Sequence, residues 1–92
     1  MIILYSKPTC PYCDRAADYL NRNNFSFTKI DVTEDATALA FIKEKGHKTV
    51  PQIYFDDRIL VEGGYDGLSR LSTEELNRRI QQYASGKNDF QL

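Results

Sequence analysis

Cysteine, histidine and tryptophan are scarce in this chain. Its 92 residues include two cysteines, one histidine, one methionine and no tryptophan. Two cysteines exclude a framework of several disulfides, which is the usual support of small secreted domains. A structural zinc site needs four ligands, and His47 is the only further typical nitrogen or sulfur ligand, so a zinc site within one chain is also disfavoured. The chemistry of the cysteines must therefore come from the pair itself.

A strong charge of either sign and a long hydrophobic run are also missing. The chain has 12 Lys and Arg residues against 13 Asp and Glu, a net charge of -1, which provides no basic face for a nucleic acid. The sequence shows no apolar stretch of membrane-spanning length and no secretory signal pattern. We therefore expect a cytoplasmic protein that binds neither nucleic acid nor membrane, with one domain and a modest core.

The two cysteines form the motif Cys10-Pro11-Tyr12-Cys13, between an expected strand and an expected helix. Ile2 to Tyr5 is short, apolar and rich in strand-forming residues, while residues 14–20 have the pattern of an amphipathic helix. Cys10 then falls at the helix N-cap and Pro11 at the first helical position, where proline is favoured. A structural disulfide closing so short a loop would constrain the unfolded chain little. Thiol-disulfide exchange is therefore the leading interpretation.

The helix start predicts different roles for the two sulfurs. Free backbone N–H groups and the positive end of the helix dipole stabilise an anion at the N-cap, so we expect the pKa of Cys10 to fall below the usual value of about 8.5. Lys7, three residues upstream, adds a cation. Cys13 lies one turn further on, at a spacing that lets it form a disulfide with Cys10. We expect Cys10 to be the nucleophile and Cys13 the resolving thiol.

The rest of the chain alternates between strand and helix patterns. The first half is predicted to contain a helix from Pro11 to about Asn23, a strand at Phe25–Val32 and a helix at Ala36–Lys45. A hairpin of Gln52–Phe55 with Arg58–Glu62 follows. The last predicted elements are a short helical turn capped by Asp66 and ending at Leu71, and a helix that opens with a capping box at Ser72 and runs to about Tyr83.

This order of elements predicts the topology. A β-α-β unit requires parallel strands joined by a right-handed crossover, whereas the hairpin is antiparallel. We therefore predict an α/β fold with a four-stranded mixed sheet flanked by helices on both faces. Residues 1–84 should form the domain, and residues 85–92 are expected to be a flexible C-terminal tail.

Two further segments could bind a ligand, and each has an ordinary structural alternative. A cis bond before Pro51, in Thr49-Val50-Pro51, would turn the Val50 backbone outward to pair with an extended thiol peptide, although base rates favour a trans proline. Gly63-Gly64-Tyr65-Asp66 can offer N–H groups to a carboxylate, or can simply turn the chain into a helix. A nearby cluster of basic residues can bind a second carboxylate or can simply form a solvated helix end. Its members are Lys43, Lys45, His47 and Lys48.

In order and spacing, Cys10–Cys13, Thr49–Pro51 and Gly63–Asp66 resemble the three signature segments of dithiol glutaredoxins. The resemblance runs from Ile2 to about Leu71. It implies a thioredoxin fold, a cis bond before Pro51, and a monomeric thiol-disulfide oxidoreductase that uses glutathione as reducing co-substrate and holds no permanent cofactor or metal. The implied substrates are protein disulfides and glutathione mixed disulfides, with ribonucleotide reductase as a familiar example.

The resemblance also implies a set of glutathione contacts. Lys7 would meet the glycine carboxylate of glutathione, and Val50 its cysteinyl backbone. The amides of Tyr65 and Asp66 would hold the γ-glutamyl carboxylate, and Tyr12 would flank the sulfur. The implied glutathione site comprises Lys7, Tyr12, Thr49, Val50, Pro51, Gly64, Tyr65 and Asp66, next to the active-site turn of Pro11 and Tyr12.

One position departs from the family pattern, and two rival functions remain. Many relatives carry an aspartate where this chain has Gly67, so either Asp66 compensates or glutathione binds less tightly. A thioredoxin-like donor reduced by a flavoprotein is the first rival, against which the Gly63-Gly64 segment and the basic residues argue. The second is an iron-sulfur carrier in which two protomers each supply Cys10 and two glutathiones supply the other thiolates. Pro11 stiffens the turn and disfavours that dimer.

Overall fold

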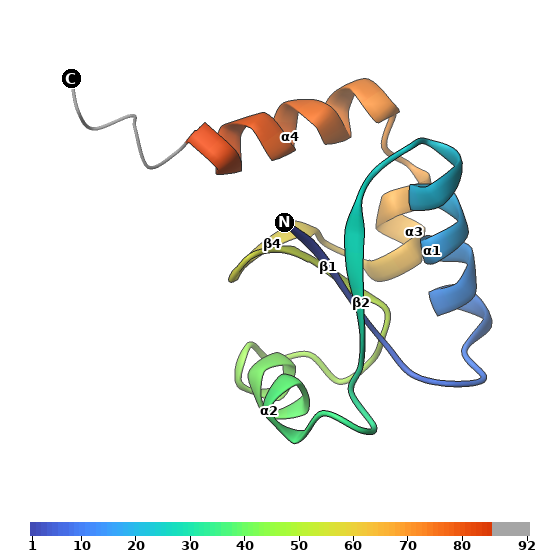
Figure 1. Ribbon diagram of the computed structural model, residues 1–92, viewed down its shortest axis with the longest axis vertical. Coiled ribbons are helices and arrows are strands. Elements are labelled where there is room, and N and C mark those ends of the chain that lie inside the picture. The colour runs from blue at the N-terminus through green and yellow to red at the C-terminus, as the bar shows by residue number, and fades with distance from the viewer. Residues whose placement is uncertain (86–92) are drawn as a thin grey trace.

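The apolar segments of the sequence pair into a four-stranded mixed sheet (Figure 1). The computed structural model describes residues 1–85. The strands are β1 (Ile2–Ser6), β2 (Phe27–Asp31), β3 (Gln52–Phe55) and β4 (Arg58–Val61), and the helices are α1 (Pro11–Arg22), α2 (Ala36–Glu44), α3 (Gly64–Ser69) and α4 (Thr73–Ser85). The strand order is β2-β1-β3-β4, with β1 parallel to β2 and the other neighbouring pairs antiparallel. The predicted mixed sheet is confirmed.

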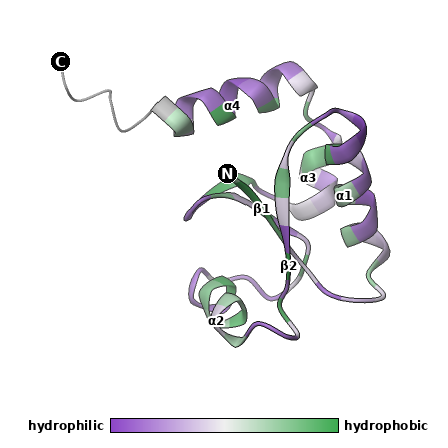
Figure 2. Cartoon of the chain, in the orientation of Figure 1, coloured by the Kyte–Doolittle hydropathy of each residue, from purple (hydrophilic) through white to green (hydrophobic). Residues whose placement is uncertain are grey.

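The strands contribute side chains to two hydrophobic clusters, because successive side chains point to opposite faces of the sheet. The first cluster lies between the sheet and α1, α3 and α4, and its buried members are Ile2, Leu4, Ala16, Leu20, Ile53, Leu60, Val61, Leu68 and Leu76. The second lies between the sheet and α2, and comprises Tyr5, Val32, Ala38, Ile42 and Tyr54. In Figure 2 the hydrophobic colour follows β1, whereas α4 is mostly hydrophilic with separate hydrophobic residues. Helices therefore cover both faces, as predicted.

The ends of the early elements fall close to their predicted positions. Helix α1 stops at Arg22, with Asn23 at its C-cap and Asn24 at a φ of 63°. Strand β2 is shorter than predicted, because Phe25 belongs to the preceding turn, where its N–H donates to the Leu20 carbonyl at 2.9 Å. Helix α2 ends one residue early, with Lys45 as its C-cap. These differences leave the topology unchanged.

Helix α3 begins three residues earlier than predicted, and the predicted cap at Asp66 is wrong. Gly63 occupies the N-cap with a φ of 88°, and no side chain caps the helix. Gly64 follows with a φ of 60°, so both residues adopt conformations that a Cβ would disfavour. The Asp66 carboxylate lies within the first turn, 3.2 Å from the Arg70 guanidinium. The two glycines turn the chain sharply enough for the helix to start at once.

Helix α4 opens at Ser72 as predicted and extends slightly further. The Ser72 hydroxyl accepts the N–H of Glu75 at 3.1 Å, while the Glu75 carboxylate pairs with Arg78 and Arg79. The helix runs to Ser85, so the boundary expected after residue 84 falls in its last turn. The remainder of the predicted tail, residues 86–92, lies outside the described part of the chain. Within residues 1–85, no helix is both long and apolar enough to span a membrane.

Candidate active site

Cys10 occupies the N-cap of α1, as the sequence predicts. Its backbone is extended, with φ of -118° and ψ of 100°, and Pro11 follows at the start of the helix. The Cys10 sulfur accepts the backbone N–H of Cys13 at 3.2 Å. Thr9, immediately before it, has a φ of 53°, a conformation uncommon for a residue with a β-branched side chain. The loop after β1 therefore places the Cys10 sulfur against the Cys13 N–H in the first helical turn.

Cys13 is the less accessible member of the pair. The two cysteines form a disulfide, with their Cα atoms 5.2 Å apart. Cys13 is completely buried, whereas 6% of Cys10 is exposed. An incoming thiol or disulfide can therefore reach Cys10 before Cys13.

Tyr12, which lies between the two cysteines in the sequence, makes an aromatic contact between α1 and α3. It is 58% exposed, and its ring stacks on that of Tyr65 with centroids 6.3 Å apart and an interplanar angle of 29°. The Arg15 guanidinium lies 5.4 Å from the centroid of the Tyr12 ring on the same helix. The contact between Tyr12 and Tyr65 brings the first and third signature segments together.

The middle segment meets the third one through backbone. The Val50–Pro51 bond is cis, as the resemblance implied. A Cβ on Gly64 would lie 3.0 Å from the carbonyl oxygen of Pro51, so the start of α3 lies directly against this proline. The Thr49 carbonyl accepts the side-chain amide of Gln52 at 2.9 Å. Among residues 1–85, the N–H and C=O of Val50 have no backbone partner.

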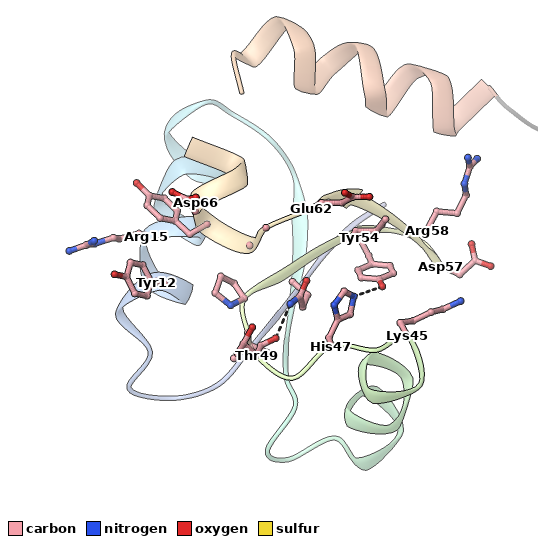
Figure 3. Close-up of a pocket in the computed structure, with 17 residues that line it drawn as sticks. Tyr12, Arg15, Lys45, His47, Thr49, Tyr54, Asp57, Arg58, Glu62 and Asp66 are labelled. Carbon is pink, nitrogen blue, oxygen red and sulfur yellow. Dashed lines mark hydrogen bonds between the residues drawn. The ribbon is translucent and has the colours of Figure 1, made fainter. Parts of the chain in front are cut away.

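An open groove of about 1280 Å³ runs past all three segments (Figure 3). The predicted site residues that line it are Tyr12, Thr49, Val50, Pro51, Gly64, Tyr65 and Asp66. Cys10 is not among the lining residues and lies two residues before Tyr12, which is one of them. Lys7 is exposed in the loop between β1 and α1 and lies outside the lining. The structure thus brings most of the predicted glutathione site together and leaves Lys7 at its margin.

The groove continues beyond the predicted site, toward the hairpin and the end of α2. The further lining residues are Arg15, Lys45, His47, Gln52, Tyr54, Asp57, Arg58, Ile59, Glu62 and Gly63. Lys45 and His47 belong to the basic cluster noted in the sequence, and Gly63 belongs to the third signature segment. Helix and strand periodicity could have identified two more of these lining residues. Arg15 lies three residues from Tyr12 and so shares its face of α1, and Tyr54 follows Gln52 by two residues and so shares its face of β3.

The far part of the groove holds a polar pair under α2. A ring nitrogen of His47 lies 2.6 Å from the Tyr54 hydroxyl, and the two rings meet edge to face. Burial, and to a smaller extent the nearby Tyr5, raise the pKa of Tyr54 above its usual 10.0. Figure 3 shows His47 between Thr49 and Tyr54 along the groove.

Few groups near the site could hold a metal. Among residues 1–85, no group of three or more His, Cys, Asp or Glu side chains is arranged to bind an ion. The groove instead combines aromatic rings, exposed backbone and side chains of both charges. Such a surface suits a peptide-like ligand with several polar groups.

Comparison with known proteins agrees with this geometry. The sequence model of the glutaredoxin family matches residues 2–60. Glutaredoxin 1 of Rickettsia typhi is 35% identical over 93 aligned residues, covering 97% of this chain and 88% of the relative. Glutaredoxin 3 of Escherichia coli K12 is 39% identical over 69 residues, covering 74% and 81%. A solved buckwheat glutaredoxin-glutathione complex has a TM-score of 0.69 at 21% identity, over 88% of this chain and 76% of that chain. This chain therefore belongs to the glutaredoxin family and is a thiol-disulfide oxidoreductase with a thioredoxin-like fold.

Proposed function

We propose that this protein reduces both glutathione mixed disulfides and protein disulfides, with glutathione as the reductant and Cys10 as the nucleophile. The observation that carries the proposal is the position of Cys10 at the start of α1, where the Cys13 N–H donates to its sulfur. When Cys10 is reduced, an N–H group in this position at the positive end of the helix favours the thiolate, which is the form that attacks disulfides. Membership of the glutaredoxin family supports glutathione as the co-substrate.

The mixed-disulfide reaction needs only one cysteine. The Cys10 thiolate attacks the glutathione sulfur of the substrate, so that a bond forms between Cys10 and glutathione and the substrate leaves as a thiolate. The thiolate of a second glutathione then attacks the glutathione sulfur bound to Cys10. Oxidised glutathione leaves, and the Cys10 thiolate is restored.

The protein-disulfide reaction uses both cysteines. Cys10 attacks the substrate disulfide and forms a mixed disulfide with the protein. Cys13 then attacks the Cys10 sulfur, which releases the reduced protein and forms the disulfide seen between these residues. Two glutathiones reduce that disulfide in turn and leave as oxidised glutathione. We include ribonucleotide reductase among the protein substrates, on the family resemblance.

The groove supplies a place for glutathione beside Cys10. We assign the cysteinyl backbone of glutathione to Val50, whose own N–H and C=O are unpaired among the described residues. The γ-glutamyl carboxylate is assigned to the first N–H groups of α3, at Tyr65 and Asp66, which precede the first intrahelical bond at Gly67. Lys7 is assigned to the glycine carboxylate. The solved buckwheat glutaredoxin-glutathione complex, which shares the fold, supports glutathione as the ligand.

We further propose that residues 1–84 act as a monomeric cytoplasmic unit. The two hydrophobic clusters lie within these residues and leave few large apolar side chains exposed, namely Met1 and Tyr12 among the described residues. Tyr12 belongs to the proposed site. A large apolar interface between copies is therefore not needed to complete the fold.

The test is a pair of coupled assays on the same preparation. In the first, glutathione and glutathione reductase drive reduction of a small glutathione mixed disulfide. In the second, thioredoxin reductase replaces both as the electron source. The proposal predicts turnover in the first assay and little in the second. The reverse result would identify a thioredoxin-like donor and overturn the proposal.

A further inference from the structure

Gly67 lies on the side of α3 that faces the end of β4. A Cβ at this position would sit 1.8 Å from the carbonyl oxygen of Glu62 and 3.4 Å from Cγ1 of Val61, whereas real Cβ atoms essentially never come within 3.0 Å of such a neighbour. Any other residue at position 67 would therefore force the α3 backbone and the Glu62 carbonyl apart by at least 1.2 Å.

Neither side of this contact can move freely. The Glu62 peptide follows Val61, which is 1% exposed and pairs with Ile53 in the sheet. Helix α3 is held by Leu68, which is completely buried in the first hydrophobic cluster. The N–H of Gly67 also donates to the Gly63 carbonyl at 3.1 Å. A residue with a side chain at position 67 would thus strain a turn that is fixed at both ends.

The two sides of the contact are also two walls of the groove. Glu62 and Gly63 line it before the helix, and Gly64, Tyr65 and Asp66 line it at the helix start. A shift of either the Glu62 peptide or the start of α3 would therefore move one wall of the groove. The displacement would reach the active site, because Gly64 lies against the Pro51 carbonyl and Tyr65 stacks on Tyr12. An error of about 1 Å in such a wall is enough to spoil the placement of a ligand.

We propose that Gly67 is a positioning residue for the glutathione site. Because Gly67 has no side chain, α3 can pack directly against the Glu62 carbonyl. This contact determines where the amides of Tyr65 and Asp66 lie relative to Pro51. The missing side chain at position 67 is then a geometric requirement of this chain, and an aspartate does not fit without moving the helix. The inference rests on the proposed use of glutathione.

The test compares Gly67→Ala with a control that lowers stability elsewhere. Gly67→Ala should raise the KM for glutathione by about three- to tenfold, as expected when one or two hydrogen bonds weaken, and should change kcat by less than about twofold, since the hydrogen bond from Cys13 to the Cys10 sulfur does not involve α3. The control is Ala40→Gly, which places glycine at an exposed position of α2 on the opposite face of the sheet. It should lower the melting temperature and leave the KM unchanged.

The outcomes separate this inference from the proposed function. An unaltered protein that does not turn over with glutathione would overturn the proposed function. Normal turnover of the unaltered protein, together with an unchanged KM in a folded Gly67→Ala, would overturn only the role of Gly67. A KM that rises equally in Ala40→Gly would do the same, because the effect would then follow stability alone.

A second measurement decides the matter if Gly67→Ala does not fold. The unaltered protein is titrated with S-methylglutathione, which cannot form a disulfide, while its amide resonances are followed. Coupling of the helix start to the groove predicts that the Gly67 resonance shifts together with those of Tyr65 and Asp66. Shifts at Tyr65 and Asp66 with no change at Gly67 would overturn the inference.

Discussion

At the scale of single residues, one backbone hydrogen bond distinguishes the two cysteines. Both side chains are chemically identical, but only the Cys10 sulfur lies where the N–H of another residue, Cys13, can donate to it. Cys13 is completely buried within α1, and its sulfur does not lie where a backbone N–H can donate to it. The reactivity of the pair therefore depends on where the helix begins, because a shift of α1 by one residue would move the N-cap away from Cys10.

The first prediction concerns the reactivity of reduced Cys10. Its rate of alkylation by iodoacetamide should remain high well below the usual thiol pKa of about 8.5, because the helix start stabilises the thiolate. Mass spectrometry after partial alkylation at a series of pH values would assign the label to each cysteine. If Cys10 reacted appreciably only above about pH 8, the N-cap would not be stabilising its thiolate.

The second prediction concerns Lys7, which lies outside the lining of the groove. If its ammonium reaches the glycine carboxylate of glutathione, Lys7→Ala should weaken glutathione use by about 0.5 to 2 kcal/mol, the range for one partly hydrated charge-assisted contact. Steady-state kinetics over a range of glutathione concentrations would measure the loss. Lys29→Ala, on the exposed part of β2, is the matched control. Equal kinetics for both variants would remove Lys7 from the site.

At the scale of the elements, α4 protects the outer edge of the sheet. Strand β4 lies at the end of the strand order, so part of its backbone has no neighbouring strand. The Tyr83 hydroxyl donates to the Ile59 carbonyl at 2.8 Å, and the Arg79 guanidinium donates to the Leu60 carbonyl at 3.1 Å. The ring of Tyr83 also lies 4.3 Å from the Arg58 guanidinium. Helix α4 thus has a structural role that its sequence does not reveal.

The third prediction tests this role with Tyr83→Phe, which keeps the ring and removes the hydroxyl. Loss of one partly buried hydrogen bond should lower the free energy of unfolding by about 1 kcal/mol. The KM for glutathione should not change, because Tyr83 lies outside the groove. Urea unfolding and steady-state kinetics on the same sample provide both values. Full stability in Tyr83→Phe would show that the hydrogen bond to Ile59 contributes nothing to holding α4.

At the scale of the whole molecule, three tyrosines link stability to alkaline pH. Burial raises the pKa of Tyr5, Tyr19 and Tyr54 above 10.0, with smaller contributions from Asp35 to Tyr5 and from Tyr5 to Tyr54. Each hydroxyl therefore stays protonated in the folded chain at pH values where it ionises in the unfolded chain. The unfolded state then binds fewer protons, so its free energy falls relative to the folded state as the pH rises.

The fourth prediction follows from that sign. The tyrosine contribution to stability should be fully present below about pH 10 and should be lost as the pH rises above it. Urea unfolding at a series of pH values, with tyrosinate absorbance recorded in parallel, measures both events. Tyr54→Phe, which lacks one of the three hydroxyls, should show a shallower decline. An identical decline in Tyr54→Phe would mean that Tyr54 does not contribute.

The sequence predicts the order of strands and helices well, because local physics determines it, whereas the cis bond before Pro51 is expected only from the family resemblance. The proline after Cys10 marks the helix start, and strand alternation marks the two faces of the sheet. The cap at Asp66 is predicted wrongly because two glycines can begin a helix without a side-chain cap. The far end of the groove and the close contact of Gly67 with Glu62 depend on how distant segments meet, which no local pattern encodes.

In the proposed mechanism Cys10 alone carries the glutathione reaction, while Cys13 is needed to release protein substrates. Cys10→Ser and Cys13→Ser are therefore assayed with glutathione on one small mixed disulfide and on one protein disulfide. The account predicts that Cys10→Ser loses both activities, whereas Cys13→Ser keeps reduction of the mixed disulfide and loses most reduction of the protein disulfide. Equal loss of both activities in Cys13→Ser would contradict the account and indicate a thioredoxin-like mechanism that always requires the two cysteines.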